Sequence, residues 1–337
     1  MIHKKTVQTK VYYTAAQKAN VRNLIILTLI VVGVCAAFLL MNAYPEKPKL
    51  FRYILSLRFP TLAVMIIAAF AIGCASLVFQ SIINNRIVTP CLLGMNSMYT
   101  LVHTAVVFVA GSGSIFATNA NLSFVVDLIV MSVSATFVYS YMFKKTGNNV
   151  LYVLLIGTVL SSFFGSIQST MIRVMDPNEY DTLLTTLVAD FNNVNVEVIS
   201  FSLLILTALT IFLRKDLLLL DVITLGKDQA INLGVDYDRT VRRLLWGVVL
   251  CIAVATAMVG PISFLGLIIA NLARQMLKTY RHGQLIIGSA LMGMLAIIAG
   301  QLISQHVFSY SVPLSTFITI GGGIYFLYLL LFKKGGI

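Results

Sequence analysis

Few side chains in the apolar part of this sequence could do chemistry, and their spacing predicts no catalytic centre. Asp127 and His103 lie in separate apolar runs, and Gln80 and Gln168 are polar but neutral. Ionisable groups at membrane depth are costly to bury, so they are the first candidates for a function. We interpret Asp127 as an interfacial residue near the outer end of its segment. His103 is either a packing histidine or part of a pathway, and both glutamines favour hydrogen bonds between helices.

The cysteines and histidines do not have the spacing of metal ligands. Each cysteine lies inside an apolar run and none belongs to a C-x-x-C motif, which is typical of small core residues. The four histidines are far apart in the sequence, whereas a zinc site needs converging ligands. We therefore expect no catalytic residue, no metal and no cofactor. A phosphate-binding G-x-x-x-x-G-K-[ST] loop is also absent from the sequence, so any energy source must lie in another chain.

The composition defines the elements that must carry these side chains. The 337 residues are 58 % hydrophobic and only 11 % charged, whereas soluble domains are about a quarter charged. At about 20 apolar residues per span, this is an all-α polytopic membrane protein with about ten transmembrane helices. No polar stretch can hold a soluble domain of about 100 residues or more. The net charge of +12 does not indicate nucleic-acid binding, because the basic residues are dispersed between the apolar segments.

Ten apolar runs predict ten spans and one transmembrane domain over residues 23–333. A basic segment, residues 1–22, precedes this domain, and a short tail, residues 334–337, follows it. One run is short and follows Gly260-Pro261, which favours a broken helix. Gly321-Gly322-Gly323 is typical of a close-packing face or a kink rather than of a phosphate cradle. The expected spans are 23–43, 60–83, 91–110, 122–143, 150–173, 196–213, 241–259, 262–273, 284–304 and 313–332.

The basic residues orient these spans. Of the 24 lysines and arginines, nineteen fall on the side of the N-terminus, and the other side receives Lys47, Lys49, Arg52, Arg58 and Arg173. Positive residues concentrate in cytoplasmic loops, so we expect both termini in the cytoplasm. The outer segment after Arg173 is acidic. The longest inner segment, residues 214–243, contains a stretch that predicts a short amphipathic helix ending near Gly234.

One segment carries a resemblance to a known family. Residues 260–268, G-P-I-S-F-L-G-L-I, followed by Arg274, resemble the signature of the permeases of iron-siderophore and vitamin B12 ABC importers. The resemblance covers about residues 52–332. It implies a ten-span permease that pairs with a second permease, carries two cytoplasmic ATPases and receives a ferric siderophore from an extracellular binding protein. Further matches are Arg58-Phe59-Pro60, Gly73, Gln80, Asn85, Pro90, Leu93-Gly94, Pro313, Gly322 and Phe326.

The resemblance also implies two contact sites. Arg58 matches an arginine that docks the binding protein, and Arg52 could replace a second arginine that is Thr61 here. The cytoplasmic turn over residues 271–284 matches the segment that contacts the ATPase. Departures from the family pattern concentrate there, which favours a sister permease as partner. The coupling residues expected to face a partner are Asn271, Arg274, Lys278, Arg281 and His282.

Other functions stay open at this point. The same architecture would serve import of haem, cobalamin or another metal chelate. An ion-coupled secondary carrier would need a titratable group in mid-membrane, and a membrane-embedded enzyme or scaffold would transport nothing. We expect a non-catalytic, multi-pass subunit of a bacterial plasma membrane, with its pathway along the seam between two permeases and lined by small and polar residues.

Overall fold

The computed structural model describes residues 2–41, 46–111, 113–114, 119–146, 150–192, 195–309 and 311–332, and within these ranges the regular elements are all helices. Lys333, Lys334 and the tail lie outside the described residues. The helices are α1 (Ile2–Leu40), α2 (Pro48–Ile83), the 3₁₀ helix η1 (Pro90–Leu93), α3 (Met95–Ala110), α5 (Ala120–Thr146), α6 (Val150–Val174), α7 (Pro177–Leu187), α8 (Val196–Leu218), α9 (Leu220–Ile223), α10 (Lys227–Asn232), α11 (Tyr237–Val259), α12 (Leu265–Met276), α13 (His282–His306) and α14 (Leu314–Phe332).

Each of the ten expected spans overlaps one or two of these helices. Seven are long and apolar enough to cross a membrane: α1, α2, α5, α6, α8, α11 and α13. The apolar helices α3 and α14 are shorter. The span expected to be broken is the 12-residue α12, which begins at Leu265 only after a non-helical stretch. The predicted polytopic helical fold is therefore confirmed.

Several span boundaries differ from expectation: α1 begins at Ile2 rather than at residue 23, and two other differences have a clear local cause. Helix α2 begins at Pro48 rather than at Pro60, which lies inside the helix. Proline is favoured in the first turn of a helix, and an interior proline costs one backbone hydrogen bond, here in an exposed stretch of α2. The third expected span is split into η1 and α3 at Gly94, whose φ of +97° breaks the helix.

Two short helices were not expected. In α7, Asp176 caps the first turn by accepting a hydrogen bond from the Asn178 backbone, and Pro177 and Glu179 follow it. This D-P-x-E pattern is a helix-start signal that the sequence already carries. The other is the four-residue α9. The predicted amphipathic helix before Gly234 is confirmed as α10.

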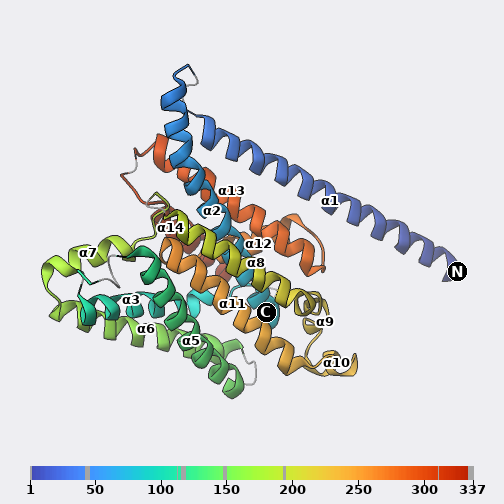
Figure 1. Ribbon diagram of the computed structural model, residues 1–337. Helices are drawn as coiled ribbons and strands as arrows, with labels where there is room; N and C mark the ends of the chain where they lie inside the picture. The colour runs from blue at the N-terminus through green and yellow to red at the C-terminus, as the bar shows by residue number, and fades with distance from the viewer. Residues whose placement is uncertain are drawn as a thin grey trace.

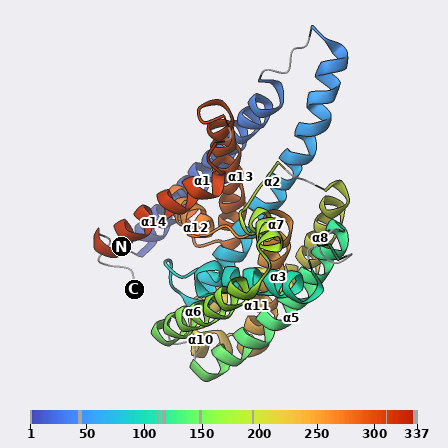
Figure 2. The same ribbon diagram turned by 90° about the vertical axis from the view of Figure 1, so that its left-hand side faces the viewer.

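Helix α2 is the centre of the bundle. In its most apolar window, 78 % of the residues are buried, and α2 packs against α13, α11, α12 and α8. Helices α3, α5 and α6 pack on one another and join the bundle through α11, away from the projecting helix α1 (Figures 1 and 2). The start of α1, α9 and α10 lie at one end of the molecule, and the start of α2 lies at the other.

The signature segment 260–268 brings three helices into close contact. A Cβ at Gly266 would overlap the Ser76 hydroxyl of α2, and a Cβ at Gly322 of α14 would overlap Phe264. Phe264 itself has a φ of +62°, and it precedes the first turn of α12. The prediction of a close-packing glycine face in α14 is thus confirmed for Gly322, whereas Gly321 and Gly323 face open space.

Candidate functional site

The end of the bundle that we expect to face the cytoplasm carries an exposed segment formed by α9, α10 and their flanking residues. Gly226 and Gly234 bound α10 with φ angles of +104° and +82°, which turn the chain sharply on either side. Leu225, Ile231 and Leu233 are 52 %, 52 % and 62 % exposed, although this segment is rich in charge and lies outside the apolar spans. Large apolar side chains exposed on an aqueous surface indicate a protein interface.

The turn between α12 and α13 lies beside this segment, and only part of it is exposed as expected. Lys278 and Arg281 are exposed. Asn271 and His282, each 4 % exposed, are buried, and Arg274 is half-buried. Asn271 and His282 therefore do not present their side chains outward as expected, because both are enclosed by this chain, and Asp221 of α9 bonds His282.

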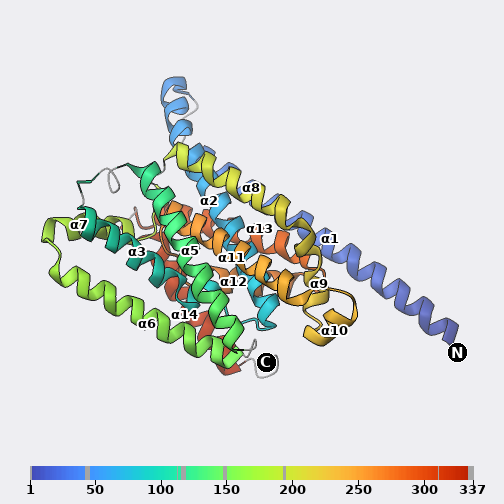
Figure 3. The ribbon, with the colours of Figure 1, turned by 60° about the horizontal axis from the view of Figure 1, so that its bottom comes forward.

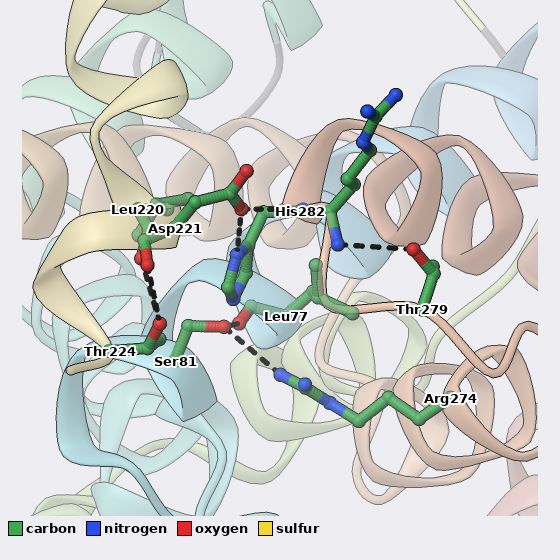
Figure 4. A network of polar contacts seen from close by, with 9 residues as sticks. Leu77, Ser81, Leu220, Asp221, Thr224, Arg274, Thr279 and His282 are labelled. Carbon is green, nitrogen blue, oxygen red and sulfur yellow. Dashed lines mark hydrogen bonds and ion pairs between the residues drawn. The ribbon is translucent and has the colours of Figure 1, made fainter. Parts of the chain in front are cut away.

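The less exposed residues of the turn bind neighbouring loops. The Asn271 side-chain amide donates to the Arg86 carbonyl at 2.9 Å, and Gln80 donates to the same carbonyl at 2.9 Å. Together they fix the loop that follows α2. Arg274 donates to the Ser81 hydroxyl at 3.0 Å and so links α12 to the end of α2 (Figure 4).

His282 is held by α9. One carboxylate oxygen of Asp221 accepts the His282 backbone N–H at 2.9 Å and lies 2.5 Å from ring Nδ1 (Figure 4). Asp221 and His282 are 61 residues apart in the chain. The structure therefore joins the two cytoplasmic connections, α8–α11 and α12–α13, into one surface. Asp221 is a site residue that the sequence analysis missed.

At the outer end, the two predicted docking arginines have different environments. Arg58 donates from Nη1 to the carbonyls of Phe38, Leu39 and Met41 at 2.9, 3.1 and 2.6 Å, so it caps the end of α1. Arg52 is exposed, two turns nearer the start of α2. The guanidinium of Arg58 is thus largely engaged within the chain, while Arg52 is open to a partner.

Inside the bundle, Asp127 and His103 form a buried pair. Oδ2 of Asp127 lies 2.9 Å from Nδ1 of His103, and the residues are 2 % and 7 % exposed. Tyr99 stacks on the imidazole with ring centroids 5.9 Å apart. The interpretation of Asp127 as an interfacial residue is wrong, because α3 packs over it. His103 is hydrogen-bonded and enclosed, as a packing histidine would be, and its part in a pathway stays a separate prediction.

The two glutamines differ in their partners. Gln168 of α6 accepts from Thr100 at 2.9 Å and donates to Thr104 at 3.3 Å, both on α3, so its predicted role between helices is confirmed. Gln80 instead bonds the Arg86 carbonyl in the loop after its own helix. Its amide therefore closes a turn and does not join two spans.

Helix α6 presents a hydroxyl-bearing face outward. In its most apolar window only 11 % of the residues are buried, the lowest share among the seven candidate spans of the described chain, and α6 lies along an edge of the bundle (Figure 3). Thr158, Ser162, Ser166 and Thr170 recur every four residues and are exposed. Each of these hydroxyls donates to a carbonyl one turn back in α6, at 2.8–3.0 Å. Small side chains of this kind let another helix approach closely, so this face favours contact with a second protein chain.

The sequence that builds this fold matches a known protein family. Residues 23–332 match the model of the FecCD transport family. The chain belongs to the FecCD transport family. As a member it is a multi-pass permease of the bacterial plasma membrane, and the transport it serves is that of an ABC importer with ATPase and substrate-binding partners.

Individual FecCD relatives agree. The chain is 39 % identical over 279 residues to the petrobactin import permease YclO of Bacillus subtilis, which covers 83 % of this chain and 89 % of that protein. It is 30 % identical over 316 residues to the petrobactin import permease FatC of Bacillus anthracis, with 92 % and 89 % covered. The fold matches an inward-facing metal-chelate type ABC transporter with a TM-score of 0.79, at 20 % identity, over 94 % of this chain and all of that one.

Proposed function

We propose that this chain is the membrane permease of an importer that carries a ferric siderophore of the petrobactin kind into the cell. The observation that carries the proposal is the 39 % identity to a petrobactin import permease over 83 % of the chain. A second petrobactin import permease matches over 92 % of the chain. These relatives favour a siderophore over haem or cobalamin.

The substrate is tested by competition. The permease is reconstituted in liposomes with its candidate ATPase, sister permease and binding protein, and uptake of radiolabelled ferric petrobactin is followed. Excess unlabelled ferric petrobactin should abolish the uptake of label, and equal amounts of haem or cobalamin should leave it unchanged. No uptake of labelled petrobactin, with uptake of labelled haem or cobalamin by the same complex, would assign the transporter to that other chelate.

The energy source belongs to other subunits in this proposal. Two cytoplasmic ATPases bind the surface formed by α9, α10 and the 277–281 turn, and a second permease completes the pore. The exposed Leu225, Ile231 and Leu233 supply apolar contacts, and Lys278 and Arg281 supply charge. Asn271, Arg274 and His282 position the turn from inside. Residues 1–22 then form a cytoplasmic segment ahead of the 23–333 permease domain.

Co-purification with the candidate ATPase tests this surface. Ile231→Ser with Leu233→Ser, and separately Lys278→Glu with Arg281→Glu, should each reduce ATPase recovery. The matched control is Lys47→Glu with Lys49→Glu, which makes the same charge change on exposed residues at the opposite end. Equal recovery of the ATPase with all three variants would show that it binds a different surface of the permease.

The outer contact and the pathway complete the proposal. Arg52 contacts acidic residues of the binding protein. Arg58 bonds the end of α1 and so holds the first turns of α2, which include Arg52, in place. The hydroxyl face of α6 lines the substrate pathway at the seam with the second permease. The exposure of Thr158, Ser162, Ser166 and Thr170 on the least buried span supports this assignment.

A further inference from the structure

The contact between Asp221 and His282 caps a long helix from a distant element. Helix α13 begins at His282, and its N-cap residue, Arg281, makes no side-chain capping bond. Asp221 of α9 supplies the missing acceptor for the first backbone N–H of α13, at 2.9 Å, and also bonds the ring of the same residue. The helix dipole favours a carboxylate at a helix N-terminus. The contact of Asp221 with the start of α13 is therefore stabilised by electrostatic attraction as well as by hydrogen bonds.

The histidine end of this contact is closely enclosed. His282 is 4 % exposed, while the side chain of Asp221 is 38 % exposed. Leu220 and Ile223, on either side of Asp221 in α9, are buried against the bundle. Helix α9 packs on α2 and α8, and it is linked to α13 by the Asp221–His282 hydrogen bonds, so a displacement of α9 reaches α13 through these bonds.

Helix α13 connects this joint to the outer surface. Its 25 residues span about 37 Å. Near its other end, Gln301 donates to Asn192 at 2.9 Å, and Ser304 donates to the Val312 carbonyl at 2.8 Å. Both side chains line an outer cavity of about 290 Å³ that is walled by the α7–α8 and α13–α14 connections. One continuous helix thus bonds the cytoplasmic segment at its start and the outer connections at its end.

Close packing makes α13 respond as a unit. A Cβ at Gly293 would lie 3.2 Å from the Ala69 carbonyl oxygen of α2, and Ser289 donates to the Gly73 carbonyl at 3.2 Å. Helices in such tight contact shift as bodies between discrete arrangements rather than bending locally.

We propose that Asp221 and His282 are a positioning pair for energy coupling: they transmit movement of α9 and α10 into α13, and so to the outer cavity. The inference rests on the proposed binding of the ATPase to α9 and α10, and extends it by naming the residues that pass the movement on. Neither residue contacts the substrate.

The test is the ratio of siderophore uptake to ATP hydrolysis in the reconstituted complex. Asp221→Ala should leave ATPase recovery intact, because the exposed apolar residues of α9–α10 are unchanged, and should lower the ratio about fivefold or more. His282→Ala should do the same, and the double variant should be no worse than either single one. Asp221→Asn keeps an acceptor oxygen for the backbone N–H and should restore part of the ratio.

The matched control is Asp181→Ala, which removes an exposed carboxylate from α7 at the other end and should leave the ratio unchanged. A normal ratio in the Asp221→Ala complex would overturn the positioning role while leaving ATPase binding in place. Failure of the wild-type chain to recruit the ATPase would overturn both proposals. If Asp221→Ala does not accumulate, the ratio of uptake to ATP hydrolysis is measured for His282→Ala and Asp221→Asn instead, and a normal ratio in His282→Ala overturns the positioning role.

Discussion

Replacement of Asp127 tests whether its carboxylate stabilises the fold or takes part in transport. Nδ1 of His103 and Oδ2 of Asp127 lie 2.9 Å apart, and when the carboxylate is ionised it can only accept, which makes Nδ1 the donor. Asp127→Asn keeps an acceptor oxygen but loses the charge. Hydrogen bonds to charged groups contribute about 1.5–3 kcal/mol and neutral ones about 0.5–1.5 kcal/mol, so the expected loss of stability is about 1 kcal/mol. Asp127→Ala leaves the buried imidazole nitrogen unpaired and should cost about 1–3 kcal/mol.

The assay has two readouts, the thermal unfolding midpoint in detergent and ATP-driven uptake in liposomes. We expect Asp127→Asn to keep most of the uptake with a small drop in midpoint, and Asp127→Ala to show a larger drop. Asp181→Asn, at an exposed position on α7, controls for the loss of one negative charge and should leave the midpoint unchanged. An Asp127→Asn protein with a normal midpoint and no uptake would refute the reasoning, since the carboxylate would then act in transport itself.

The remaining predictions concern three other contacts. Arg58→Ala loses the bonds to three α1 carbonyls and should cost about 1–3 kcal/mol in the same unfolding assay, whereas Arg52→Ala should leave the midpoint unchanged and weaken binding-protein affinity in a titration. Gly266→Ala drives a methyl into Ser76 and should lower stability by about 1–3 kcal/mol, while Gly283→Ala, which faces open space, should not; equal midpoints would contradict the packing of α12 on α2. Ser162→Leu with Ser166→Leu, on the exposed face of α6, should reduce uptake without lowering ATPase recovery in co-purification, and undiminished uptake would place the pathway elsewhere.

The sequence predicts the spans well because each is an apolar run. The composition of such a run is enough, without knowledge of its neighbours, to predict that it crosses a membrane. The helix-breaking signal at Gly260-Pro261 is local too and marks a real interruption, whereas the break at Gly94 lies inside the expected span 91–110 and was not predicted. Helix α7 could have been found from Asp176-Pro177 and Glu179, since a cap, a first-turn proline and an early acid act within a few residues.

The site was less predictable because it depends on which helix faces are brought together. Asp127 lies near the outer end of its run, but its environment is set by α3, which supplies His103 from 24 residues away. The burial of His282 likewise depends on Asp221, 61 residues earlier, and neither residue alone carries a signal for the other. A basic turn predicts a cytoplasmic location by charge alone, but the share of its side chains that is exposed follows from packing.

The most direct test of the account is the driving force for uptake. Proteoliposomes that contain the permease with its candidate ATPase, sister permease and binding protein are loaded with ATP, and entry of radiolabelled ferric petrobactin is measured. We predict uptake that requires hydrolysable ATP, the ATPase and the binding protein, and that persists when proton and sodium gradients are collapsed. Uptake by the permease alone, driven by an ion gradient and independent of ATP, would contradict the account.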